Sequence, residues 1–173
     1  MASRIHPVIS DVAKEQAVLE GMKKTVAIGK PHILVNNAGP VAIGAKAGFI
    51  DMVEATFSMI HFVTTALRQN QRRVQALLIS LRLLDRYLKE AATVELKGDI
   101  RVNAVAPGGP IRTPRNATFI DEGVFSKTID RNPSGRPGKP EELANGIMFL
   151  LSLAAGYING HMLCIDGGLS VAE

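Results

Sequence analysis

The sequence predicts an α/β fold in which helices cover a doubly wound parallel β-sheet. Residues 33–35 form an apolar, mostly β-branched run, which is typical of a strand buried on both faces of a parallel sheet. A helical repeat precedes this strand, because Val18, Met22 and Val26 recur at four-residue steps within residues 13–28. A second β-branched run, residues 100–106, returns to the pattern of a strand.

The strand that begins at residue 33 ends at Asn36-Asn37-Ala38-Gly39. In an open α/β sheet, ligands bind beyond the carboxyl ends of the strands. We therefore expect Asn37, Ala38 and Gly39 to lie beside a ligand, with Gly39 allowing a close approach of the backbone.

The amino-terminal part is predicted to contain a short strand, residues 8–12, that ends near the carboxylate of Asp11. A different role is open to Ser10 or Asp11, because either side chain can cap the first N–H groups of the helix over residues 13–28. Both roles can hold together. Gly29 is expected to end that helix.

The middle of the chain is predicted to be helical. Residues 49–67 have the pattern of one or two helices, and residues 74–96 carry a leucine stripe that faces either the core or a second subunit. An alternative for the start of the second segment is a strand over residues 77–79, which would place Ser80 at its end.

The strand over residues 100–106 runs into Pro107-Gly108-Gly109-Pro110, which on its own is an ordinary turn sequence. The long polar segment 113–138 contains one short helical piece near residues 124–130, and segments of this length are often lids over a ligand.

The carboxyl-terminal part is predicted to be a helix followed by a last strand. The helix covers residues 140–153, with Pro140 at its first position and two glutamates in its first turn. The strand covers residues 161–165 and is closed by Asp166-Gly167-Gly168.

Length and composition suit one domain over residues 1–173, since the chain is 46% hydrophobic and 21% charged. The single cysteine, Cys164, stands in an apolar run and is predicted to be a buried core thiol.

We expect a cytoplasmic protein with no membrane partner, because the longest apolar run, residues 147–155, is too short for a bilayer span. The basic stretch 68–73 lacks aromatic residues and is interpreted as a solvated helix end, so no nucleic-acid partner is predicted. No metal site is predicted.

Residues 33–39, Ile-Leu-Val-Asn-Asn-Ala-Gly, resemble the fourth-strand motif of the short-chain dehydrogenase/reductase family. Four further stretches agree with the family in order: residues 10–12, 100–108, 135–142 and 164–168. The sequence is therefore identified as a member of this family, tropinone-reductase-like or another NAD(P)-dependent member. The resemblance implies a Rossmann-like sheet from which the first βαβ segment is missing.

The resemblance also implies a cofactor, NAD or NADP, and hydride transfer to or from a small-molecule alcohol or carbonyl substrate. In the family pattern, Asp11 and Val12 would contact the adenine ring. The segment after the strand at 100–106 would contact the nicotinamide end, with one glycine more than the family pattern. The residues that the resemblance assigns to cofactor binding are Asp11, Val12, Asn37, Ala38, Gly39, Pro107, Gly108, Ile111 and Thr113. A homodimer or homotetramer is implied as well.

The catalytic part of the family pattern is not matched. The family needs a Tyr and a Lys four residues apart on one helix, so that both lie on the same face. In this region Tyr87 and Lys89 are two residues apart, about 200° around a helix. Ser80 is the one catalytic candidate, and the glycine-rich phosphate turn is not found. We expect the chain as given to lack activity; the alternative is a non-catalytic oligomerisation or binding module of the same fold.

Overall fold

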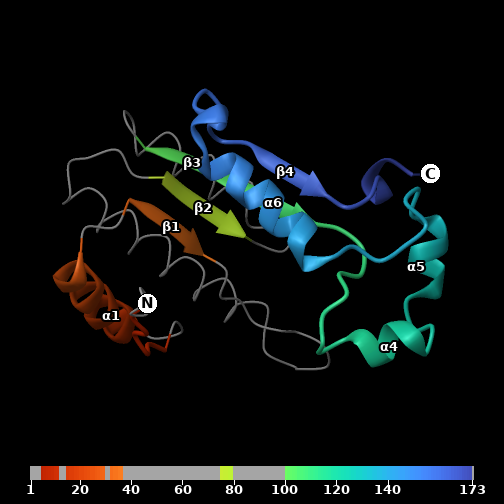
Figure 1. Cartoon of the computed structure of the whole chain (residues 1–173), viewed down its shortest axis with the longest axis horizontal. Helices are drawn as coiled ribbons and strands as arrows, with labels where there is room; N and C mark the ends of the chain where they lie inside the picture. Colours follow the sequence, from red (N-terminus) through yellow and green to blue (C-terminus); the bar gives the residue numbers. More distant parts are fainter. Residues whose placement is uncertain (1–4, 12–14, 30–31, 37–74, 80–99, 173) are drawn as a thin grey trace.

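The structure is a computed structural model, and it describes residues 5–11, 15–29, 32–36, 75–79 and 100–172. Its centre is a parallel sheet with the strand order β1-β2-β3-β4 (Figure 1). The strands are β1 (Ile33–Asn36), β2 (Gln75–Ile79), β3 (Arg101–Pro107) and β4 (Met162–Ile165). This confirms the predicted α/β fold with a parallel sheet, and the strands predicted at residues 33, 100 and 161 are present.

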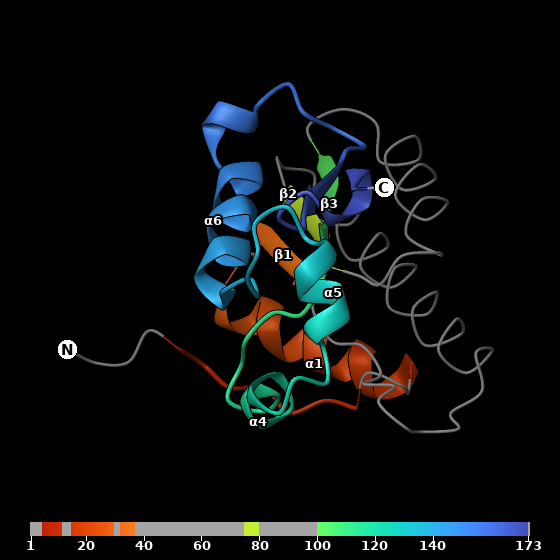
Figure 2. The ribbon, with the colours of Figure 1, turned by 90° about the vertical axis from the view of Figure 1, so that its right-hand side faces the viewer.

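The described helices are α1 (Glu15–Ile28), α4 (Ala117–Asp121), α5 (Ser126–Arg131) and α6 (Pro140–Leu151), with short 3₁₀ turns η1 (Leu153–Ala155) and η2 (Leu169–Val171). Helix α6 contacts β2, β3 and β4 and covers one face of the sheet. Figure 1 shows α4 and α5 beyond the carboxyl ends of the strands, and Figure 2, which views the molecule from that side, shows α1 beyond the β1 edge. The carboxyl edge is therefore the edge over which the loop segments fold.

The core is centred on β3, which pairs on both sides and lies under α6. Val102, Ala104 and Val105 are at most 1% exposed, and Val105 packs with Leu150 of α6. Burial of apolar side chains on this scale is the main favourable term that holds α6 on the sheet.

Helix α6 begins as predicted but ends two residues earlier. Pro140 occupies the first turn, and the Glu142 carboxylate accepts a hydrogen bond from the Lys139 N–H at 2.8 Å. The helix ends at Leu151 because Ser152 has an extended backbone, and its hydroxyl donates to the Phe149 carbonyl at 2.7 Å.

The prediction that the strand at residue 33 is buried on both faces is wrong for two side chains. Ile33 is 50% exposed and Val35 is 43% exposed. The reason is the position of β1, which pairs only with β2 among the described strands and so forms an edge of the sheet.

The predicted strand over residues 8–12 is also wrong where the structure describes it, because residues 8–11 form no strand. This segment packs on α1 instead: the Ser10 hydroxyl donates to the Ala17 carbonyl at 2.8 Å. Gly21 leaves the space for this contact, since a β-carbon there would lie 3.3 Å from the Ser10 side chain.

The helix predicted over residues 74–96 is wrong at residues 75–79, which form β2. This strand pairs in parallel with both β1 and β3, and that pairing outweighs the helical spacing of the leucines. The alternative of a strand ending just before Ser80 is therefore correct for residues 77–79. Ser80, the rest of that segment and the helices predicted at 49–67 lie outside the described residues.

The polar segment 113–138 contains the short helix predicted near residues 124–130, seen as α5, and one helix that was not predicted. Helix α4 has only five residues and ends before Gly123, whose φ of +76° favours glycine. One helical turn is too short to show an apolar repeat in the sequence.

The described residues offer neither a membrane span nor a metal-binding cluster. No described helix has both the length and the apolar character of a bilayer span. Within the same residues, no group of three or more His, Cys, Asp or Glu side chains is placed to hold a metal ion.

Candidate functional site

The turn that follows β3 joins the carboxyl ends of β3 and β4. The Gly108 N–H donates to the Ile165 carbonyl at 3.2 Å, and a β-carbon on Gly108 would lie 2.1 Å from the β-carbon of Asp166. Gly109 follows with a φ of +70°, a left-handed conformation that side chains disfavour. Both glycines are therefore required by the local backbone, whether or not a ligand is bound.

Beyond this turn, the chain is fixed by short-range hydrogen bonds. Ile111 forms a parallel bridge with Gly138. The Thr113 N–H and hydroxyl both donate to Oδ1 of Asn116, at 2.7 and 2.9 Å, and Nδ2 of Asn116 donates to the Ile111 carbonyl at 2.7 Å. The Thr113 hydroxyl thus has a partner within its own loop.

The turn that follows β4 is organised by the Asp166 carboxylate. Its oxygens accept hydrogen bonds from the N–H groups of Gly168 at 3.0 Å and Ser170 at 2.8 Å. Hydrogen bonding from Ser170, and then from Gly168, lowers the pKa of Asp166 below its ordinary value. The carboxylate is therefore ionised at neutral pH and is stabilised by groups of its own turn.

Asn132 links α5 to the turn that follows β4. Its side chain is buried, with Nδ2 donating to the Asp166 carbonyl at 2.9 Å and Oδ1 accepting from the N–H and hydroxyl of Ser134, each at 2.9 Å. Asn132 is not among the residues predicted from the sequence. The Asn-Pro-Ser-Gly sequence that begins there is a turn signal and could have indicated it.

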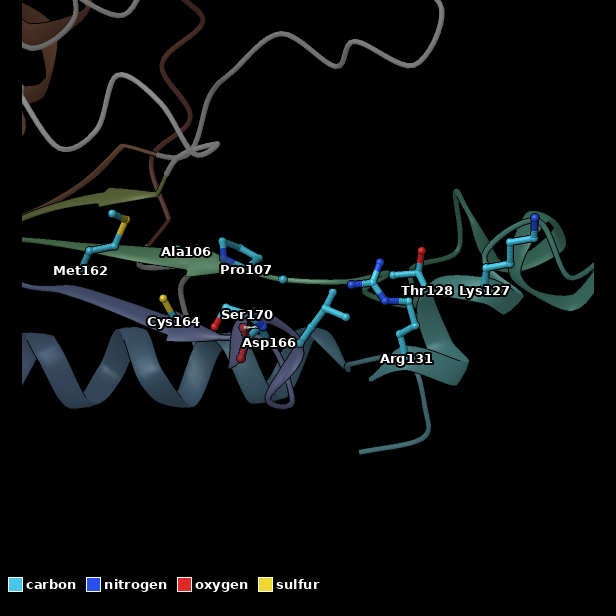
Figure 3. Close-up of a pocket in the computed structure, with 11 residues that line it drawn as sticks. Ala106, Pro107, Lys127, Thr128, Arg131, Met162, Cys164, Asp166 and Ser170 are labelled. Atoms are coloured by element: carbon cyan, nitrogen blue, oxygen red, sulfur yellow. Dashed lines mark hydrogen bonds between the residues drawn. The ribbon is translucent and has the colours of Figure 1, made fainter. Parts of the chain in front are cut away.

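A hollow of about 540 Å³ lies at the carboxyl ends of β3 and β4 (Figure 3). Its lining comes from β3 and its turn, β4 and its turn, and one side of α5: Ala106, Pro107, Gly108, Lys127, Thr128, Arg131, Met162, Cys164, Asp166, Leu169 and Ser170. This volume is within the range of small-molecule sites, about 300–1,000 Å³.

Cys164 lies in this lining and is exposed, so the prediction of a buried core thiol is wrong. The reason is strand alternation: Leu163 and Ile165 pack toward the core of Val105 and Leu150, and Cys164 between them faces the opposite side of β4.

Two cations line the hollow, and they differ in direction. Figure 3 shows the Arg131 guanidinium directed toward Pro107 and the Lys127 ammonium directed outward. In the part of the chain that the structure describes, neither side chain forms an ion pair. By contrast, Arg112 pairs with Asp121 at 2.8 Å and Arg136 pairs with Glu142 at 2.6 Å.

The structure brings some of the predicted cofactor residues together. Pro107 and Gly108 line the hollow, and Ile111 lines a smaller neighbouring hollow of about 120 Å³ that Gly108 also borders. Thr113 lines neither of the two. Asp11 belongs to the segment beside α1 and borders neither hollow. The remaining predicted residues lie outside the described part of the chain: Val12, Asn37, Ala38, Gly39 and Ser80.

A parallel sheet with a hollow at its carboxyl edge defines an α/β protein of the class that binds small molecules at this edge. Residues 80–170, just over half of the chain, match the family model described as Enoyl-(Acyl carrier protein) reductase. Together with the matches below, this shows that the chain belongs to the short-chain dehydrogenase/reductase family of oxidoreductases.

Curated relatives are similar over part of their own length. A tropinone reductase homolog of Arabidopsis thaliana, At2g29340, is 43% identical over 84 residues, which are 48% of this chain and 27% of the relative. Another, the chloroplastic At2g29260, is 30% identical over 94% of this chain and 58% of its own length. The dehydrogenase LinX of Sphingobium indicum is 30% identical over 91% of this chain and 59% of its own length. The chain thus spans 27% to 59% of the length of these relatives.

Solved structures agree in fold. A gluconate 5-dehydrogenase from Burkholderia cenocepacia, crystallised with NADP and tartrate, has a TM-score of 0.78 and 26% identity, covering 94% of this chain and 74% of that one. A mutant of a Serratia marcescens short-chain dehydrogenase/reductase has a TM-score of 0.77 and 26% identity, and the match covers 93% of this chain and 75% of that one. The predicted Rossmann-like fold is therefore confirmed.

Proposed function

We propose that this chain forms the nicotinamide end of a site for NAD or NADP, in an oxidoreductase lineage that acts on small alcohols or carbonyl compounds. The observation that carries the proposal is the contact between the Pro107–Gly108 turn and the Asp166 turn beside the 540 Å³ hollow. Family membership and the NADP-bound gluconate 5-dehydrogenase neighbour support it.

The residues present fit such a cofactor in size and charge. The hollow has a backbone floor at Pro107 and Gly108, polar groups at Thr128 and Ser170, and a cation at Arg131. Pro107, Gly108 and Ile111 would contact the nicotinamide end. Thr113 would approach the phosphates if its hydroxyl released Asn116 and donated a hydrogen bond to a phosphate oxygen instead. When bound, the cofactor supplies or accepts the hydride. Asp11, Val12, Asn37, Ala38 and Gly39 stay the predicted contacts for the rest of the molecule.

We further propose that the 173-residue chain does not turn over substrate. Ser80 comes directly after β2, which favours it as the counterpart of the family serine. Proton exchange with the substrate oxygen needs a tyrosine whose pKa a nearby lysine lowers, and Tyr87 and Lys89 do not have the required spacing.

The experiment is a titration of the purified chain with NADH and NADPH, followed by cofactor fluorescence and by amide NMR. We expect weak binding, with dissociation constants above the micromolar range, and shifts of the Gly108 and Gly109 amides. Gly29, at the end of α1, serves as the internal control and should not shift. Shifts confined to other regions, or none at saturating cofactor, would contradict the site.

Turnover is measured separately with a panel of small carbonyl compounds, including sugar acids, because two solved neighbours are described as gluconate dehydrogenases. We expect no oxidation of NADH or NADPH above the rate without protein. Protein-dependent oxidation, abolished by Ser80→Ala, would show that the chain is an active enzyme.

A second candidate function is a non-catalytic binding or oligomerisation module. The observation in its favour is a set of exposed apolar side chains on α6, on η1 and just after η1: Met148 is 65%, Phe149 44%, Leu153 93% and Tyr157 105% exposed. Exposed apolar patches of this kind mark interaction sites. A homodimer or homotetramer seen by sedimentation, and lost in Leu153→Ser, would support it; a monomer at all concentrations would exclude self-association.

The cytoplasmic location stays a prediction, and one relative is described as chloroplastic.

A further inference from the structure

Arg131 differs from Arg112 and Arg136, two other arginines near the carboxyl edge of the sheet. It closes α5 and lines the larger hollow, with its guanidinium directed toward Pro107 (Figure 3). Arg112 and Arg136 have carboxylate partners, whereas Arg131 has none among the described residues. A guanidinium has a fork of N–H donors that matches carboxylate and phosphate oxygens.

Among the described residues that line the hollow, the one carboxylate does not neutralise Arg131. Asp166 also lines the hollow, but its oxygens accept hydrogen bonds from Gly168 and Ser170, and it forms no ion pair with Arg131 in the described structure. Thr128, one turn before Arg131 on α5, adds a hydroxyl to the same wall. The free donors of the hollow are therefore suited to an anion.

We propose that Arg131 binds an anionic group, a carboxylate or a phosphate, of a small molecule held in the larger hollow. The inference rests on the proposed small-molecule site and adds the charge of its ligand. Two sources share this chemistry: the carboxylate of a hydroxy-acid substrate and the diphosphate of the dinucleotide. Lys127, directed outward, contributes to the local field and makes no direct contact.

The test is a set of NMR titrations of the full chain with gluconate, with its neutral counterpart glucitol, and with inorganic pyrophosphate. The variant is Arg131→Gln. The matched control is Arg115→Gln, which removes the same charge from an exposed arginine that lines neither hollow. Thermal unfolding of each variant checks that the fold is kept, since Arg131 and Arg115 are both exposed.

We expect at least one anion to bind and to weaken about tenfold in Arg131→Gln, as for the loss of an exposed charge-assisted contact. Arg115→Gln and Lys127→Gln should change binding little, and glucitol should bind more weakly than gluconate. A response to gluconate alone identifies the substrate carboxylate as the source, and a response to pyrophosphate alone identifies the cofactor diphosphate.

The inference is overturned if neither anion binds, or if Arg131→Gln and Arg115→Gln weaken binding equally. The NADH titration described above reports separately on the proposed function. Shifts at Gly108 with NADH but no Arg131-dependent anion binding would leave the cofactor site standing and refute only the role of Arg131.

Discussion

Gly108 and Asp166 approach so closely that a β-carbon on Gly108 would lie 2.1 Å from the β-carbon of Asp166. The contact joins the end of β3 to the end of β4, where the Gly108 N–H also donates to the Ile165 carbonyl. The floor of the candidate site is therefore set by main-chain contact, and a side chain at position 108 has no space.

The first prediction concerns this contact. Gly108→Ala should lower the free energy of unfolding by about 1–3 kcal/mol, because the new methyl group overpacks against Asp166. Urea denaturation measures the change. Gly29→Ala is the matched control, since a β-carbon there meets nothing within 4 Å. Equal stability of the two variants would show that the turns are further apart than described.

The second prediction concerns Asn132. Asn132→Ala should lower the free energy of unfolding by about 2–4 kcal/mol, because one buried side chain makes three hydrogen bonds to Asp166 and Ser134. Ser134→Ala removes one of the three and should cost about 1 kcal/mol. Urea denaturation compares the two. A cost for Asn132→Ala no larger than that for Ser134→Ala would contradict the buried network.

The third prediction is a pH dependence that arises from Glu142. The side-chain hydrogen bond from Arg136, followed by that from the Lys139 N–H, lowers the pKa of Glu142 from 4.5 to about 2. Because the folded-state pKa is lowered, the contribution to stability is complete above pH 4.5 and is lost as the pH falls toward 2. The effect should be small, since the side chain is 40% exposed.

Glu142→Gln removes this contribution, so its stability should fall less steeply than that of the natural chain between pH 4.5 and about 2. Chemical denaturation at steps across this window, and at neutral pH, provides the measurement. Glu141→Gln is the control, because the neighbouring carboxylate is exposed and outside the ion pair. If the free energy of unfolding fell equally with pH in the natural chain and in Glu142→Gln, the effect would be ruled out.

The fourth prediction concerns Cys164. Its exposed thiol should react with a disulfide reagent in the folded protein, without denaturant. Absorbance of the released thiolate measures the rate, and Cys164→Ser is the control for background reaction. A thiol that reacts only after addition of denaturant would support the buried position that the sequence predicted.

Strands β1 and β3 could be predicted because each is a short β-branched run that ends in turn residues. Strand β2 could be predicted only as an alternative to a helix, since Leu77, Leu78 and the leucines that follow also fit a helical repeat. Its pairing with β1 and β3 decides the conformation, and those partners are far away in the sequence. Cys164 shows the same limit: an apolar strand does not reveal which of its faces is covered.

Of the candidate site, only the turn that follows β3 was predicted from the sequence; the side chains contributed by α5 and the residue after it were not. Pro107 and Gly108 were assigned to the site by the family resemblance, since on their own they belong to an ordinary turn sequence, and both line the hollow. Arg131 and Asn132 were missed because their roles depend on how α5 folds over that edge. Residues assigned by family resemblance outside the described part stay predictions.

The order of the strands in the sheet has a consequence for synthesis. Among the described strands, each pairs with the strand before it in the chain, so β4, which covers the second side of β3, is synthesised after β3 and its other neighbour. Until then β3, whose residues 102–105 are buried in the folded protein, presents unpaired backbone groups to the surroundings. A nascent chain that stalls before residue 162 is therefore exposed to aggregation through β3, and the four residues of β4 protect that side of the sheet.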